Sequence, residues 1–186
     1  MNRTIYTIPN ALTFLRALGI PLFAYLALSR HADAWAVAVL AVGGATDYFD
    51  GKLARAWNQT SRLGEIMDPA IDRAYIAVTL IVLLIRGAIP LWLIVVIVIR
   101  DLILGILTLA MKRRGLGLLT VTYSGKAATF NLLYAFPFLL LALGDTTLGD
   151  IAFVVGWSFA LWGVGLYLST GVDYFISGWR KLSGAN

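Results

Sequence analysis

Hydrophobic runs of about 20 residues follow one another along almost the whole chain, and short polar segments separate them. A helix that spans a membrane needs about 20 mainly apolar residues. The stretches that meet this requirement are residues 10–29, 33–55, 65–86, 90–111, 125–143 and 149–176. The pattern predicts an all-α integral membrane protein with six transmembrane helices, preceded by a short N-terminal juxtamembrane segment.

Turn-forming residues separate these predicted helices. Pro9 suits the start of the first helix. Gly87 and Pro90 interrupt the chain between the third and fourth, and Gly115 and Gly117 follow the fourth. No internal repeat, low-complexity segment or domain boundary is visible, so we expect residues 1–186 to form a single transmembrane domain.

Composition supports the membrane class. The chain has 186 residues, of which 60% are hydrophobic and 13% charged, whereas soluble domains carry about 25% charged residues. The net charge of +5 does not indicate nucleic-acid binding, because the basic residues are scattered among apolar runs. Such residues beside membrane spans usually set topology and meet anionic lipid headgroups. The absence of cysteine excludes disulfides and thiolate metal sites.

Basic residues are distributed unevenly about the predicted spans. One side receives Arg3, Lys52, Arg55, Arg62, Arg73, Lys112, Arg113, Arg114, Lys126, Arg180 and Lys181. The other side receives only Arg30 and Arg86. The positive-inside rule therefore predicts that both termini are cytoplasmic. The N-terminal segment lacks the pattern of a signal or transit peptide, which favours a prokaryotic cytoplasmic membrane.

Four aspartates lie near the end of the second predicted helix and the start of the third, on the expected cytoplasmic side. Asp47 and Asp50 are three residues apart, and Asp68 and Asp72 are four apart. Each pair therefore shares one face of its helix. A turn near residues 59–62 would make the two helices antiparallel, so that the two acidic faces meet.

Three interpretations fit such a cluster. The acids could form structural salt bridges with Arg55, Arg62 and Arg73. They could be protonated and relay protons or ions, as in a transporter. They could also bind divalent cations, since oxygen ligands without His or Cys suit Mg²⁺, Mn²⁺ or Ca²⁺. Gly51 and Gly64 support a ligand site, because glycine lets the backbone approach a ligand closely.

The spacing of this stretch resembles the signature of the CDP-alcohol phosphotransferase family. Every fixed position of that signature is filled. The matching residues are Asp47, Asp50, Gly51, Ala54, Arg55, Gly64, Asp68 and Asp72. The resemblance covers essentially the whole chain, because the six-span prediction agrees with it. It implies an enzyme that transfers a phosphoalcohol group from a CDP-alcohol to an acceptor hydroxyl and releases CMP.

The resemblance also implies roles for these residues. The metal-binding positions, which hold two divalent cations, Mg²⁺ or Mn²⁺, are Asp47, Asp50, Asp68 and Asp72. Asp72 also matches the proposed general base. The positions that accommodate the cytidine diphosphate of the donor are Gly51, Ala54, Arg55 and Gly64. The family further implies a homodimer.

Two other stretches indicate the branch of the family. The start, IPNALTFLRALGIPLF, resembles the branch that makes phosphatidylglycerophosphate or cardiolipin from CDP-diacylglycerol. Arg100 and Asp101 resemble a pair found in cardiolipin synthases, although Ile71-Asp72-Arg73 departs from the usual Ala-Asp-Lys. We expect Arg100 and Lys126 to bind the phosphate of the acceptor.

Phosphatidylglycerol is the expected acceptor, which gives cardiolipin as the product. The alternative acceptor is glycerol 3-phosphate, which gives phosphatidylglycerophosphate. A different class, an ion transporter, remains an alternative for a helical bundle with intramembrane acids. Transporters often show internal repeats, and none is visible here.

Overall fold

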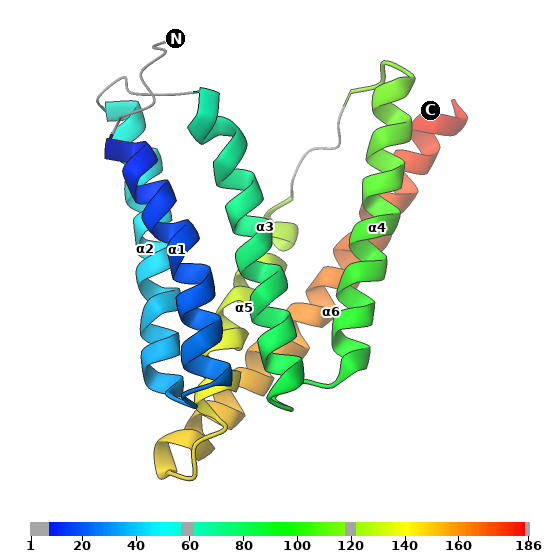
Figure 1. Ribbon diagram of the computed structural model, residues 1–186. Helices are drawn as coiled ribbons and strands as arrows, with labels where there is room; N and C mark the ends of the chain where they lie inside the picture. Colours follow the sequence, from blue (N-terminus) through cyan, green and yellow to red (C-terminus); the bar gives the residue numbers. More distant parts are fainter. Residues whose placement is uncertain (1–7, 57–61, 118–121, 185–186) are drawn as a thin grey trace. The chain divides into compact units, whose positions relative to one another are not determined.

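The computed structural model describes residues 8–56, 62–117 and 122–184. Within these ranges, the side chains of residues 8–10, 47–51, 53–56, 62–66 and 69 are not described. The described chain is helical throughout, apart from short turns (Figure 1). Its helices are α1 (Ile8–Leu28), α2 (Asp33–Ala56), α3 (Arg62–Ile85), α4 (Leu91–Arg113), α5 (Tyr123–Leu141) and α6 (Thr147–Ser183). The predicted all-α class is confirmed, and each expected span coincides with one of these helices.

The predicted turn residues end helices as expected. Gly87 follows α3 with a φ of 71°, and Pro90 immediately precedes α4. Gly115 follows α4 with a φ of 68°, in the left-handed region that favours glycine. The last helix is longer than the predicted span of 149–176, since no proline interrupts it before Gly184. That glycine adopts the left-handed conformation at the C-cap.

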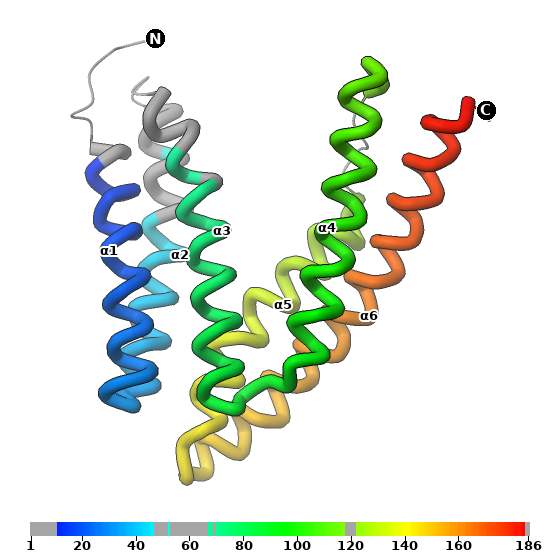
Figure 2. The backbone as a smooth tube through the Cα atoms, turned by 45° about the vertical axis from the view of Figure 1, so that its right-hand side comes forward, coloured from blue at the N-terminus to red at the C-terminus, as the bar shows by residue number. Residues whose placement is uncertain are grey.

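The helices pack as two compact units, Met1–Ala88 and Ile89–Asn186. In the first unit, α1 lies beside both α2 and α3 (Figures 1 and 2). In the second unit, α6 packs against both α5 and α4. Each unit is therefore organised around one helix that contacts the other two.

Two glycines allow the first unit to pack closely. The ring of Tyr75, from α3, reaches both Gly19 of α1 and Gly43 of α2. A Cβ atom at Gly19 would lie 2.2 Å from the Tyr75 hydroxyl oxygen, and one at Gly43 would lie 3.0 Å from it. Larger residues at these positions would collide with the tyrosine.

An ion pair stabilises the end of the first unit where α3 ends and α2 begins. Arg86, just after α3, donates to both carboxylate oxygens of Asp33, at 2.7 and 3.1 Å. It also donates to the backbone carbonyl of Ala27. The guanidinium therefore joins the end of α3 to the connection between α1 and α2 through a bidentate pair, which is a strong geometry.

The second unit uses a glycine face along α6. Gly149, Gly156 and Gly163 are spaced by seven residues and face the α5 side. Gly171 and Gly178 continue the spacing after one extra residue and face Arg100 and Leu107 of α4. Small residues at such spacings let membrane helices approach closely.

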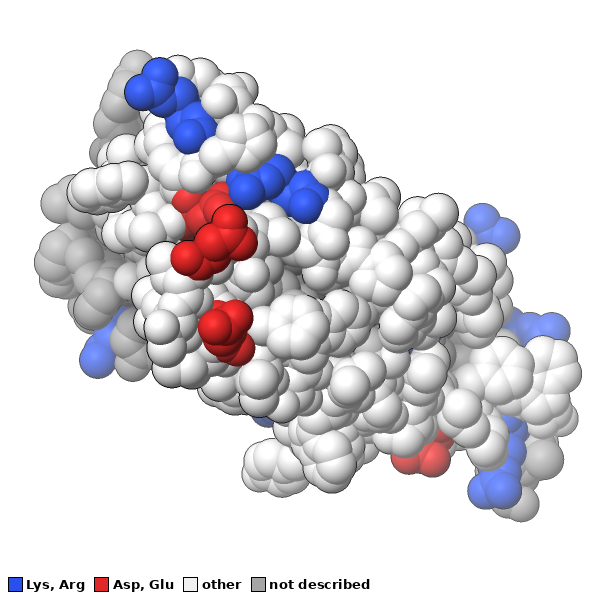
Figure 3. All heavy atoms as spheres, turned by 90° about the horizontal axis from the view of Figure 1, so that it is seen from below, with Lys and Arg blue, Asp and Glu red and all other residues white. Residues whose placement is uncertain are grey.

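Large apolar side chains cover much of the described surface. Ile106 is 69% exposed, Trp162 is 67% exposed and Leu102 is 59% exposed. Viewed from below, charged side chains occupy a few separate places, and uncharged ones cover most of the visible surface (Figure 3). Among the described residues, three helices are long and apolar enough to cross a membrane, through Ala11–Leu28, Leu91–Arg113 and Thr147–Ser183. These features indicate an integral membrane protein.

Candidate active site

The described part of the acidic cluster lies on α3. Asp68 and Asp72 are four residues apart, so their side chains lie on one face of the helix. The side chain of Asp68 is 40% exposed and that of Asp72 is 51% exposed. Both carboxylates are thus half-buried, and neither is sealed from an incoming ligand.

Two residues of α1 hold these carboxylates. The buried Arg16 places one terminal nitrogen, Nη2, 3.7 Å from Asp68 Oδ1 and 3.5 Å from Asp72 Oδ1. Thr13, one turn earlier on α1, donates a hydrogen bond from its hydroxyl group to Asp68 Oδ1 at 2.9 Å. One guanidinium therefore bridges both acids, and their oxygens converge on a common point.

The charges of this group suit a divalent cation. Two carboxylates face one guanidinium, so these three side chains sum to a net negative charge. Carboxylate oxygens are hard ligands of the kind that Mg²⁺ and Mn²⁺ prefer. Among the described side chains, no group of three acids or histidines converges to hold a metal ion. Asp68 and Asp72 therefore fit part of a metal site, and further ligands must come from elsewhere.

The remaining signature residues have helical backbones, but their side chains lie outside the description. Those on α2 are Asp47, Asp50, Gly51, Ala54 and Arg55, and Gly64 lies on α3. The connection at 57–61, where an antiparallel turn is expected, is also outside the described residues. By helical spacing, positions 47, 50 and 54 share one face of α2. Whether the α2 acids face those on α3 stays a prediction.

The salt-bridge interpretation named Arg55, Arg62 and Arg73 as partners of the acids. The side chains of Arg55 and Arg62 are outside the description. Arg16, which that interpretation did not name, supplies a cation to both acids of α3. An ion pair and a metal site are compatible here, because Asp68, Asp72 and Arg16 together still carry a net negative charge.

In the second unit, Arg100 is fixed by its neighbours on two helices. Its Nη1 lies 3.1 Å from Asp101 Oδ1, so these neighbouring side chains of α4 form an ion pair. The hydroxyl of Tyr167, on α6, donates to the same oxygen at 2.5 Å. The guanidinium carbon lies 3.9 Å from the centre of the Tyr167 ring, which is a cation–π geometry.

Lys126 lies in the first turn of α5 and is exposed. Its ammonium lies 5.8 Å from the centre of the Tyr123 ring. Thr122 caps this helix by accepting from the backbone N–H of Gly125. Tyr174 of α6 in turn accepts from the backbone N–H of Thr122 at 2.7 Å. The position of Lys126 is therefore set by a capped helix that is tied to α6.

Three residues near these groups were not among the predicted site residues. They are Thr13, Arg16 and Tyr167. A signal existed for Arg16, because an arginine inside an apolar helix is costly unless it meets an anion. Thr13 lies on the same face of α1 as Arg16, but a threonine in an apolar helix indicates a polar partner less strongly than an arginine does. Nothing in the spacing of α6 indicates that Tyr167 contacts Asp101, since that contact depends on how α4 and α6 pack.

Comparison with known proteins supports the signature. Residues 6–162 match the family model described as CDP-alcohol phosphatidyltransferase. A Streptomyces coelicolor protein named cardiolipin synthase (CMP-forming) is 47% identical over 177 residues, covering 92% of this chain and 82% of that protein.

More distant relatives show the same family. A Mycobacterium tuberculosis protein whose name contains cardiolipin synthase is 42% identical over 175 residues, covering 94% of this chain and 83% of that protein. Another from that organism, whose name contains phosphatidylglycerophosphate synthase, is 34% identical over 186 residues, covering 97% and 85%. The aspartate signature and these matches agree, and the chain belongs to the CDP-alcohol phosphatidyltransferase family.

Proposed function

We propose that this chain transfers a phosphatidyl group from CDP-diacylglycerol to phosphatidylglycerol, forming cardiolipin and CMP. The observation that carries this choice of acceptor is the order of similarity. The relative named cardiolipin synthase is 47% identical, whereas the one named for phosphatidylglycerophosphate synthesis is 34% identical. The alternative acceptor is glycerol 3-phosphate.

The proposed metal ligands are Asp47, Asp50, Asp68 and Asp72, which would hold two divalent cations, Mg²⁺ or Mn²⁺. The convergence of Asp68 and Asp72 on Arg16 supports this assignment. Bound cations neutralise the pyrophosphate of the donor and stabilise the leaving phosphate. The proposed contacts to the cytidine diphosphate come from Gly51, Ala54, Arg55 and Gly64.

Asp72 is the proposed general base. A hydroxyl group is a poor nucleophile until it loses its proton, and a nearby carboxylate can accept that proton. The acceptor oxygen then bonds to the phosphorus of the phosphatidyl group, and the bond from that phosphorus to CMP breaks. Arg16 and Thr13 keep the α3 carboxylates in place while Asp72 takes up the proton.

Arg100 and Lys126 are the proposed contacts to the acceptor phosphate. Arg100 shares its charge with Asp101, which leaves a weaker net positive charge than a free arginine would present. Such a site suits the singly charged phosphodiester of phosphatidylglycerol better than the doubly charged glycerol 3-phosphate. This electrostatic difference agrees with the order of similarity.

We further propose that all six helices span the membrane, with both termini and the active site at the cytoplasmic face of a prokaryotic cytoplasmic membrane. The uneven distribution of basic residues supports this orientation. A homodimer is proposed from the family resemblance.

The decisive experiment offers purified protein CDP-diacylglycerol and Mn²⁺ with either phosphatidylglycerol or glycerol 3-phosphate, and identifies the lipid products by mass. Cardiolipin and CMP are expected with phosphatidylglycerol. Asp68→Asn, which removes a proposed ligand while keeping the size of the side chain, should abolish both products. Phosphatidylglycerophosphate alone would establish the alternative acceptor, and no CMP in either reaction would favour the transporter.

A further inference from the structure

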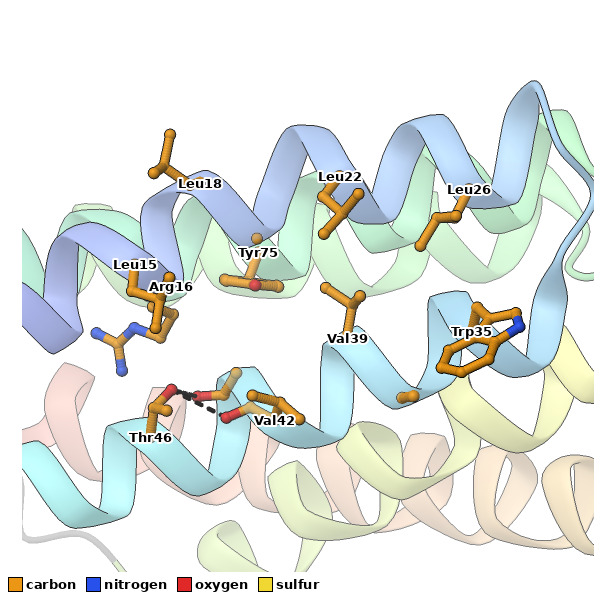
Figure 4. A pocket seen from close by; sticks show the side chains of 13 residues that line it. Leu15, Arg16, Leu18, Leu22, Leu26, Trp35, Val39, Val42, Thr46 and Tyr75 are labelled. Carbon is orange, nitrogen blue, oxygen red and sulfur yellow. Dashed lines mark hydrogen bonds between the residues drawn. The ribbon is translucent and has the colours of Figure 1, made fainter.

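A groove of about 450 Å³ runs between α1 and α2, and Tyr75 of α3 forms part of its lining (Figure 4). Arg16 and Thr46 lie at one end of it, and Leu26 and Trp35 lie at the other. The groove belongs entirely to the first unit. Through Arg16 it reaches the carboxylates of Asp68 and Asp72.

The polar groups at this end of the groove, and the two carboxylates that Arg16 contacts there, follow a definite order. Asp68, Asp72 and Tyr75 occupy one face of α3, at spacings of four and three residues. Tyr75 therefore lies about 4.5 Å further along the helix axis than Asp72. Beyond Tyr75 the walls are mainly apolar, with Leu22 and Val39 facing each other (Figure 4). The sequence along the groove is thus charged group, hydroxyl, then apolar wall.

The Tyr75 hydroxyl is a candidate donor for a ligand. Its oxygen is buried and has no hydrogen-bond partner among the residues that the structure describes. Thr46, the other hydroxyl of the groove, bonds to the backbone carbonyls of Val42 and Gly43 at 2.9 and 2.8 Å. A buried hydroxyl without a partner is costly, and Gly19 and Gly43 leave room for this one.

A diacylglycerophosphate has its groups in the same order: phosphate, ester carbonyls, then hydrocarbon chains. An ester carbonyl accepts a hydrogen bond but cannot donate one, which complements the phenol. We propose that the groove binds an acyl chain of CDP-diacylglycerol, and that the Tyr75 hydroxyl donates a hydrogen bond to its ester carbonyl. This inference rests on the proposed function, because it places the donor's phosphates beside Asp68 and Asp72.

The face of α2 that lines the groove indicates that the bound lipid is the donor rather than the acceptor. Val39 and Gly43 line the groove, and positions 47, 50 and 54 continue the same helical face at spacings of four, three and four. Those positions belong to the signature for the metal and the cytidine diphosphate. One face of α2 therefore leads from the apolar groove to the headgroup residues of a single lipid.

The first test measures the Kd of the purified protein for CDP-dioleoylglycerol and for its dialkyl ether analogue, which lacks the carbonyls. Tyr75→Phe should raise the Kd for the diester about twofold to tenfold, as expected for one hydrogen bond. It should leave the Kd for the diether unchanged. A purely structural role would alter both ligands equally, and that result, or no change in either, would overturn the contact.

The second test fills the groove. Ala38 lines it, whereas Ala41, one turn further on α2, is also exposed but lies outside it. Ala38→Phe should raise the Kd for the long-chain lipid by at least about fivefold, because added volume displaces the chain. Binding of free CDP should not change, and Ala41→Phe should resemble the unmodified protein. Equal effects of the two substitutions would contradict the proposal.

A third measurement uses the unmodified chain and so does not depend on any variant folding. CDP-diacylglycerol with a diazirine in one chain is photolysed on the protein without an acceptor. Cross-links on Leu22, Leu26 or Val39 are expected, and cross-links confined to other helices would overturn the proposal. Failure of the enzyme to release CMP refutes the proposed function, whereas CMP release with cross-links elsewhere refutes only the groove.

Discussion

At the level of single residues, Arg16 links the apolar first helix to the acidic cluster. It is 3% exposed, and its guanidinium lies within ion-pair distance of both Asp68 and Asp72. A buried cation in a membrane helix is costly without an anion, so the arginine and the acids stabilise one another. The same guanidinium repels a metal ion at the carboxylates, and thereby limits how tightly that ion binds.

Replacing Arg16 should separate these two effects. Arg16→Leu should lower the free energy of unfolding by about 1–3 kcal/mol, less than a fully buried pair would cost, because the acids are half-exposed. The variant should bind Mn²⁺ more tightly, since the repelling charge is gone. The thermal midpoint with and without Mn²⁺ measures both, and Arg16→Lys is the control that keeps the charge. An equal Mn²⁺-induced shift in all three proteins would contradict this role.

Asp72 should affect the rate of transfer more than donor binding. We expect Asp72→Asn to lower kcat on the order of 10²–10⁴-fold, the range typical of a general base. The KM for CDP-diacylglycerol should change by less than about threefold, because the other acids of the signature still hold the headgroup. Steady-state kinetics check this, with the exposed loop residue Asp145 changed to Asn as the control. Equal losses in kcat and in donor affinity would indicate that Asp72 acts only as a metal ligand and not as a general base.

At the level of elements, the glycine face of α6 sets the distance to α5. A Cβ atom at Gly156 would lie 3.0 Å from the backbone nitrogen of Leu139, which cannot move without shifting α5. Gly165, nine residues further along the same helix, has no atom within 4 Å of such a Cβ. The two glycines therefore form a matched pair that differs in packing.

Gly156→Leu should destabilise the protein by about 1–3 kcal/mol through overpacking. Gly165→Leu should leave stability close to that of the unmodified protein, because its added side chain meets open space. The thermal midpoint of each variant in detergent measures the difference. If both substitutions shift the midpoint equally, close packing at Gly156 is not what joins α5 to α6.

The sequence predicted these elements better than their contacts. Runs of about 20 apolar residues predicted the place of each helix in the described part of the chain, and Gly87, Pro90 and Gly115 predicted where helices end or begin. Contacts between helices depend on which faces pack together. The bridge from Arg16 to Asp72 and the bond from Tyr167 to Asp101 are therefore absent from any local pattern.

At the level of the whole molecule, the proposed machinery draws on both units. The first unit carries the signature aspartates, and the second carries Arg100 and Lys126. Within the second unit, Tyr167 and Asp101 fix the Arg100 side chain, whereas Lys126 is exposed at the start of α5. A substitution at Lys126 should therefore disturb helix packing less than one at Arg100. Lys126 is the better position for testing the proposed contact with the acceptor.

We expect Lys126→Ala to raise the KM for phosphatidylglycerol about threefold to tenfold, which corresponds to losing one charge-assisted contact to a phosphodiester. The KM for CDP-diacylglycerol should change much less, because the signature residues bind that lipid. Lys112, which is also exposed and lies in the last turn of α4, provides a matched control. If the enzyme only needs basic residues to attract anionic lipid, Lys112→Ala will raise both KM values as much as Lys126→Ala does. An effect confined to Lys126 and to the acceptor would instead indicate that Lys126 contacts the phosphate of phosphatidylglycerol.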